Sequence, residues 1–237
     1  MIQRLVGSEM CIRDRASRSG VTIDSKGNVV YGNIAAEAGG IDVTTTNGNI
    51  TAGGVTLSKD INADVKLEAT GNIDNQGKIV SNRNIYLKAN QITNDDSIIA
   101  GNKVAITATD FLTNNNDILS LNSNLIGEDG ITINAKTLNN NKRIAANSKI
   151  TINSHNLNNN SANSTLISGK NLDLNITNLN NDLGTIESKN ILKIRNLTNA
   201  NPNTALLFAI SDTATTISNK AGFLKAVTGI DLSLIHI

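Results

Sequence analysis

Two pairs of adjacent carboxylates are the residues of this sequence best suited to acid–base chemistry. Asp95 is followed directly by Asp96, and Glu128 by Asp129. Two carboxyl groups facing one bond divide the work of a general acid and a general base, which is how glycosidic bonds are cleaved. That chemistry needs acids from different segments to converge, and no other segment supplies an acid in register with either pair. We therefore expect both pairs to be solvated turn residues.

Histidine and cysteine offer few further sites. The histidines are His155 and His236, and the single cysteine is Cys11. A closely similar segment of the chain has Lys or Thr where His155 stands, so we expect a solvated histidine rather than the base of a Ser-His-Asp triad. Metal sites need clustered His, Cys or carboxylate ligands, and the sequence contains no such cluster. The sequence thus predicts no catalytic residue, no cofactor and no metal site.

The elements that would position these residues follow from a short repeat. "ITINAKTLNNN" at 131–141 returns as "ITINSHNLNNN" at 150–160. Each copy starts with an aliphatic-x-aliphatic pair, and successive starts are mostly 19 to 22 residues apart, with one spacing of 27. These pairs are Val65/Leu67, Ile85/Leu87, Val104/Ile106, Ile131/Ile133, Ile150/Ile152, Leu172/Leu174 and Leu192/Ile194. Self-similarity at a short period is typical of stacked repeat architectures.

Two further aliphatic columns accompany these pairs. One lies six residues before a start, at Ile79, Ile98, Leu125, Ile144, Leu166 and Ile186. The other lies seven residues after a start, at Ile92, Phe111, Leu138, Leu157 and Leu179, and asparagines follow it closely. The spacing of 27 predicts a loop, which we place near 114–117. Looser copies are Val21/Ile23, Ile41/Val43 and Val55/Leu57, with Leu224 before Ile230/Leu232.

Alternation of aliphatic and polar residues predicts two short strands per unit, each followed by a polar corner and each burying one face. Strands this short cannot bury that face alone, whereas stacked copies place column on column about 4.8 Å apart. Asparagine suits the corners, and stacked amides can pair neighbouring turns. We predict an all-β, right-handed parallel β-helix (β-solenoid) with about 19–20 residues per coil. An antiparallel sandwich would not repeat a phrase at this distance.

The composition and charge of the chain limit which classes of partner it could bind. The net charge of +1 comes from scattered residues, so we expect no nucleic-acid partner. No apolar run is long enough to span a membrane. The opening "MIQRLVGSEMCIRDR" (1–15) and the closing "SLIHI" (233–237) resemble translated sequencing-adapter tags, so we expect both to be non-native. Residues 16–232 would then be β-helical repeats, clearest over 65–199. If residues 1–15 are set aside, the remaining chain contains no cysteine, and a chain without disulfides is compatible with export.

Three segments resemble the haemagglutinin-type repeats of the filamentous haemagglutinin family, large exoproteins of bacterial two-partner secretion. They are "NQGKIVSNRNIYLKA" at 75–89, "NDLGTIES" at 181–188 and, more weakly, "NKAGFLKA" at 219–226. The resemblance implies a β-helical shaft fragment, exported through an outer-membrane secretion pore and exposed on a Gram-negative cell. The family's N-terminal secretion domain is not recognisable in the chain.

The expected function is that of a structural stalk segment of a secreted, cell-surface adhesin. It would mediate attachment to glycans or proteins of a host or neighbouring cell, and the sequence leaves open whether its parent carries a contact-dependent toxin. The alternative is a β-helical carbohydrate-active enzyme, a polysaccharide lyase or glycosidase. An ice-binding or surface-layer solenoid is a further rival, but outward Thr-x-Thr arrays are confined to Thr44–Thr46 and scattered pairs.

Overall fold

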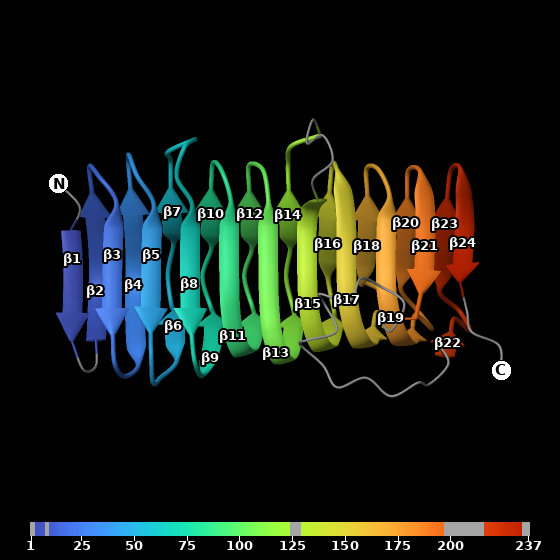
Figure 1. Cartoon of the computed structure of the whole chain (residues 1–237), viewed down its shortest axis with the longest axis horizontal. Coiled ribbons are helices and arrows are strands. Elements are labelled where there is room, and N and C mark those ends of the chain that lie inside the picture. Colours follow the sequence, from blue (N-terminus) through green and yellow to red (C-terminus); the bar gives the residue numbers. More distant parts are fainter. Residues whose placement is uncertain (1–2, 8–9, 124–128, 197–215, 234–237) are drawn as a thin grey trace.

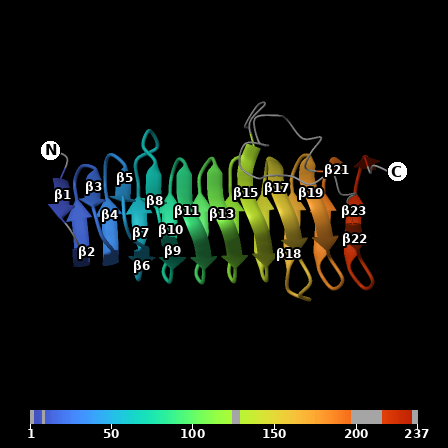
Figure 2. The same ribbon diagram turned by 60° about the horizontal axis from the view of Figure 1, so that its bottom comes forward.

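The computed structural model describes residues 3–7, 10–123, 129–196 and 216–233, and it is a β-solenoid. Every regular element in these ranges is a β-strand, and the 24 strands form one sheet in which strands pair in parallel. The coils follow one another along the long axis, with the two ends of the chain at opposite ends of the molecule (Figures 1 and 2). The predicted all-β parallel solenoid is therefore confirmed.

Each coil contributes to three parallel ladders, which we number in chain order within the coil. Six strands belong only to the first ladder, namely β1 (Gln3–Gly7), β3 (Val21–Ser25), β5 (Ile41–Thr45), β8 (Val65–Ala69), β21 (Ile191–Arg195) and β24 (Gly229–Ser233). Three strands belong only to the second ladder, namely β6 (Ile50–Ala52), β9 (Asn72–Asn75) and β22 (Thr216–Ser218). Longer strands run through both, namely β11 (Ile85–Asn94), β13 (Val104–Asn114), β15 (Asp129–Asn140), β17 (Lys149–Asn158) and β19 (Leu172–Asn180).

The third ladder closes each coil. It holds β7 (Thr56–Ser58), β10 (Ile79–Ser81), β12 (Ile98–Ala100), β14 (Ile118–Ser120), β16 (Arg143–Ala146), β18 (Thr165–Ser168), β20 (Thr185–Ser188) and β23 (Phe223–Ala226). Strands β2 (Met10–Ser17) and β4 (Val29–Ala36) run through the second and third ladders. A coil therefore has three sides, whereas the sequence predicted only two short strands per unit.

The predicted aliphatic pairs lie directly above one another in the first ladder. Val65 pairs with Ile85, Ile85 with Val104, and the register continues without slip through Ile131, Ile150, Leu172 and Leu192. All of these side chains are at most 1% exposed. Since each strand buries alternate residues, the outward positions of this ladder form a regular polar face.

One member of the second-ladder column differs from the prediction. A β-bulge after Ala108 shifts the second ladder by one residue, so Leu112 rather than Phe111 pairs with Ile92 and Leu138. Leu112 is buried and Phe111 is 40% exposed. The bulge adds one residue to the coil, a change that spacing alone does not reveal.

The long spacing has a different cause from the one predicted. Residues 114–117 form an ordinary corner, and Ile118, not Leu125, fills the third-ladder position between Ile98 and Ile144. The additional residues therefore follow Ser120, and Leu125 lies outside the described residues. Val55/Leu57 is likewise not an inward pair, because Thr56 and Ser58 are the buried residues of β7.

The ends of the described chain also belong to the ladders. β1 pairs with β3 and β2 with β4, although the sequence placed residues 1–15 outside the repeat. At the other end Leu224, Ile230 and Leu232 pair with Ile186, Leu192 and Ile194, as their spacing predicted.

A buried asparagine ladder lines the corner that follows the second ladder. Each Nδ2 donates to the Oδ1 of the next coil's asparagine, over donor–acceptor distances of 2.6 to 2.8 Å. Its members are Asn75, Asn94, Asn114, Asn140, Asn159, Asn181 and Asn219. The sequence predicted stacked amides at the corners but not their burial, which is complete from Asn75 to Asn181.

The asparagine ladder stops where the earlier coils change composition. Ala52 pairs with Asn75 and Tyr31 with Ala52, so these two residues occupy the same column. Ala52 has no side-chain donor, which explains why Asn75 Oδ1 is buried without a hydrogen-bond partner. The Tyr31 hydroxyl shares a 3.0 Å hydrogen bond with the Thr56 hydroxyl, and burial raises the pKa of the Tyr31 phenol despite this bond.

Candidate functional site

The carboxylates of Asp95 and Asp96 organise a corner. Asn115 Nδ2 donates to Asp95 Oδ1 over 2.7 Å, and the Ser97 backbone N–H donates to Asp96 Oδ1 over 2.6 Å. Such bonds are typical of turn residues, which is how the sequence interpreted the pair. The two acids therefore face different backbone and amide groups rather than one common bond.

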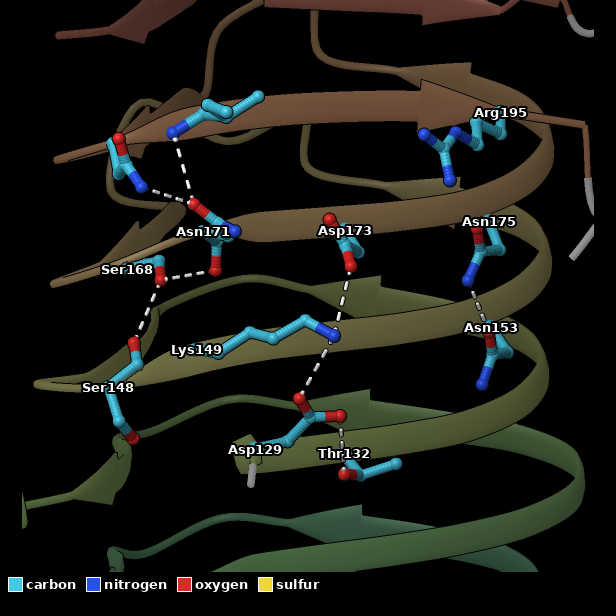
Figure 3. A network of polar contacts seen from close by, with 12 residues as sticks. Asp129, Thr132, Ser148, Lys149, Asn153, Ser168, Asn171, Asp173, Asn175 and Arg195 are labelled. Carbon is cyan, nitrogen blue, oxygen red and sulfur yellow. Dashed lines mark hydrogen bonds and ion pairs between the residues drawn. The ribbon is translucent and has the colours of Figure 1, made fainter. Parts of the chain in front are cut away.

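Asp129 belongs to an ion-pair network on the outer face of the first ladder (Figure 3). Lys149 Nζ lies 3.2 Å from Asp129 Oδ1 and 3.0 Å from Asp173 Oδ2, so one lysine bridges acids two coils apart. The Thr132 hydroxyl also donates to Asp129 over 3.3 Å. The sequence missed Asp173 as an acid near Asp129. The ion pairs of Lys149 with these two carboxylates help to hold neighbouring coils together. Glu128, the other acid of this predicted pair, lies outside the described residues.

Lys149 has a raised pKa, for opposed reasons. Burial, the largest influence, lowers it, but the hydrogen bond to Asp173 and the charges of Asp129 and Asp173 together raise the pKa of Lys149 above its usual value. A lysine whose pKa rises on folding stabilises the fold fully below its unfolded pKa of about 10.4, and the contribution is lost as pH rises through the folded value. The network therefore persists through neutral pH.

Lys149→Met is expected to lower the free energy of unfolding by about 1 kcal/mol at pH 7, because two partly exposed acids lose their partner. The loss should vanish at strongly alkaline pH, where the wild-type lysine is neutral too. Urea unfolding at both pH values measures it. Lys59→Met, which removes one ion pair between exposed Lys59 and Glu37, is the control and should change stability by less than about 0.5 kcal/mol. An equal effect of both substitutions would contradict the network's role.

The histidines and the cysteine considered in the sequence analysis are not brought together in the described residues. His155 is half-buried in β17, and its neighbour Ser154 is buried and donates to the Asn156 carbonyl over 2.8 Å. Cys11 is exposed, and His236 lies outside the described residues. Within the described ranges no three His, Cys, Asp or Glu side chains lie close enough to hold a metal ion.

Two grooves lie on the outer face of the first ladder instead. The axial groove has a volume of about 440 Å³ and is lined by Thr22, Asp42, Lys66 and Tyr86, with Gly40 and Asp64 at its edge. The first four are consecutive members of one outward column, one from each of four coils. Tyr86 faces outward between the buried Ile85 and Leu87, and the register brings it beside Lys66.

The second groove, about 330 Å³, crosses β5, β8, β11 and β13 at the C-terminal end of their first-ladder segments. Hydroxyl and amide side chains line it, including Thr44, Thr107 and Asn90. Glu68 stands between the two grooves, where Lys66 Nζ and Lys88 Nζ each lie 2.9 Å from its carboxylate. Hydrogen bonds from Lys88 and then Lys66 lower the pKa of Glu68. The ion pair of Glu68 with Lys66 thus joins the second groove, which Glu68 and Lys88 line, to the axial groove, which Lys66 lines.

In the described part of the chain there is no helix long and apolar enough to cross a membrane. Comparisons of the chain with protein-family models, with curated proteins and with solved structures find no match.

Proposed function

We propose that this chain is a segment of the stalk of a secreted adhesin of the haemagglutinin-repeat kind. In this proposal an outer-membrane two-partner secretion pore exports it, and it stands on the surface of a Gram-negative cell. There it holds a distal module, adhesive or toxic, against glycans or proteins of a host or neighbouring cell. The observation that carries the proposal is the register of the repeated aliphatic pairs, which continues without slip from coil to coil in the first ladder.

The stalk's mechanism is mechanical. Three backbone ladders connect each coil with the next, and the asparagine ladder adds a line of side-chain hydrogen bonds inside. Bending the rod would stretch the hydrogen bonds of whichever ladder lies on its convex side, and solenoids gain length simply by adding coils. Nothing in this design needs disulfides, which suits a chain that crosses a membrane unfolded.

Export is tested in the source bacterium. We expect protease added to intact cells to degrade the protein when the pore gene is present, and to leave it intact inside the cell when that gene is deleted. Antibodies raised against residues 65–196 would detect it. Protein that resists protease in the wild-type strain, while lysed cells contain it in degradable form, would contradict surface exposure.

A further inference from the structure

The axial groove has the dimensions of a ligand site. Ligand pockets in proteins are concave, have volumes of about 300–1,000 Å³ and combine apolar surface with a few convergent polar groups. The groove, of about 440 Å³, crosses four coils, from Thr22 through Asp42 and Lys66 to Tyr86. Three coil spacings make it about 14 Å long along the solenoid axis. An extended occupant lying along the rod fits this shape.

Backbone forms the edge of the groove. A Cβ on Gly40 would lie 2.6 Å from the Asp64 carbonyl oxygen, and one on Gly20 would lie 2.9 Å from the Gly40 carbonyl oxygen. The glycines are therefore required for coils to approach at this corner. As a consequence no side chain rises there, and an occupant can approach the backbone closely.

The side chains suit a sugar. Tyr86 is 36% exposed at one end of the groove, where its ring offers an apolar surface and its hydroxyl a polar tip. Asp42 and Asp64 supply carboxylate oxygens that accept hydrogen bonds, and Thr22 supplies a hydroxyl. A pyranose presents an apolar C–H face together with hydroxyl donors, so it matches both kinds of group.

Other occupants fit less well. A peptide that binds by strand addition needs unpaired backbone groups, but the strands beneath the groove, β3, β5, β8 and β11, pair with neighbours on both sides. Anionic ligands meet Asp42 and Asp64, while Lys66 is held by Glu68 at 2.9 Å. The hydrogen bond to Glu68 is also the main cause of the raised pKa of Lys66. The groove therefore disfavours an anionic ligand, and its match to a pyranose favours a neutral one.

We infer that the axial groove binds a neutral oligosaccharide, with Tyr86 as the stacking platform and Asp42 as a hydroxyl acceptor. The choice of ligand class rests on the proposed attachment role, whereas the groove itself does not. The stalk would then bind glycans along its side as well as through a distal module. Similar outward columns in further coils of a longer rod would multiply weak contacts into avidity.

The chain provides its own probe, because Tyr31 and Tyr86 are its only tyrosines. Tyr31 is 1% exposed in the core, so only Tyr86 can contact a ligand. The experiment adds neutral oligosaccharides ending in glucose, galactose or N-acetylglucosamine, and their sialylated or sulfated counterparts, to the full chain. Tyrosine ring resonances are followed by NMR. We expect at least one neutral oligosaccharide to shift the Tyr86 signals in a saturable way while Tyr31 stays unchanged.

Variants distinguish binding in the axial groove from binding elsewhere on the surface. Tyr86→Ala should weaken binding of that oligosaccharide at least tenfold, and Tyr86→Phe, which keeps the ring, should change it less than threefold. Phe111→Ala removes an aromatic ring that is similarly exposed but lies outside the groove, and should leave binding unchanged. Unaltered thermal unfolding of each variant confirms that the solenoid is intact.

Several results would overturn the inference. They are the absence of any shift at Tyr86 with the neutral panel, binding confined to the charged glycans, and equal effects of Tyr86→Ala and Phe111→Ala. None of these results bears on export, so the inferred sugar binding can be refuted while the stalk proposal remains valid. Conversely, failure of the protease test would leave a measured Tyr86 interaction untouched.

Discussion

Asn114→Asp is expected to lower the free energy of unfolding by about 3–5 kcal/mol at neutral pH, because it places an unpaired charge inside the solenoid. Asn114 is fully buried; it accepts from Asn94 and donates to Asn140, each over 2.8 Å. A carboxylate can still accept from Asn94, but it has no hydrogen for Asn140 Oδ1. Two acceptors would then face each other where water cannot enter.

The same substitution should be rescued by acid. Once protonated, the introduced carboxyl group can again donate to Asn140, and burial raises its pKa in the folded state above the unfolded value of about 3.9. An acid with a raised pKa costs little below its unfolded pKa, and the cost grows as pH rises through the folded value. Urea unfolding of the full chain at pH 4 and pH 7 measures the difference, relative to wild type at each pH.

Two further variants isolate the cause. Asn141→Asp changes an exposed residue of the next corner, whose Nδ2 donates to Asn115 over 2.7 Å, and should cost less than about 1 kcal/mol. Asn114→Leu breaks the ladder without adding charge, so its cost should not depend on pH. If Asn114→Asp were as mild as Asn141→Asp, the buried asparagine ladder would not contribute as described.

Gly77→Ala is expected to destabilise the protein by about 2–3 kcal/mol through overpacking between coils. A Cβ at Gly77 would contact the Gly54 carbonyl oxygen and lie 2.7 Å from Gly54 Cα. These are backbone atoms of the neighbouring coil, so no side-chain rotation relieves the contact. A Cβ at Gly184 or Gly222 would likewise meet a backbone carbonyl oxygen of the preceding coil, because the corner leaves no space for a side chain.

Gly229→Ala is the matched control, because a Cβ there would meet nothing within 4 Å. Its effect on the free energy of unfolding should stay within about 0.5 kcal/mol. Urea unfolding of both variants against wild type makes the comparison. Equal stability of Gly77→Ala and Gly229→Ala would show that neighbouring coils are farther apart at this corner than the fold requires.

Most of the fold could be predicted because burial repeats in each coil. Ile85, Val104 and Ile131 each face the core and each stack on the residue before, so one physical requirement recurs at each coil and appears as a column in the sequence. Asn94 and Asn140 recur for a similar reason, since an amide in a stack can both donate and accept. Columns of this kind encode the register directly.

Departures from the repeat were harder to predict. The bulge that buries Leu112 in place of Phe111 adds one residue without changing the composition, and both residues are apolar. The additional residues after Ser120 were misplaced because 114–117 is rich in asparagine, which suits loops and buried ladders equally. Three-sided coils were missed because the first two sides join in continuous strands such as β11 and β13.

The candidate sites show the same limit. Asp95 and Asp96 do lie in a turn, between β11 and β12, as the sequence predicted, and Asp96 accepts a hydrogen bond from its sequence neighbour Ser97. The bridge from Asp129 through Lys149 to Asp173, and the groove beside Tyr86, depend on which outward residues of different coils lie side by side. Outward positions vary freely from coil to coil, so no repeated pattern marks them.

The most direct test of the stalk proposal is to read the source DNA through both ends of this coding sequence. The account predicts one open reading frame in which further units of 19–20 residues replace residues 1–15 and 233–237, with an export domain upstream. Each added unit should carry the aliphatic pair and the corner asparagine described above. A start codon at Met1 and a stop codon directly after Ile237 would contradict the proposal that this solenoid is a segment of an exported stalk.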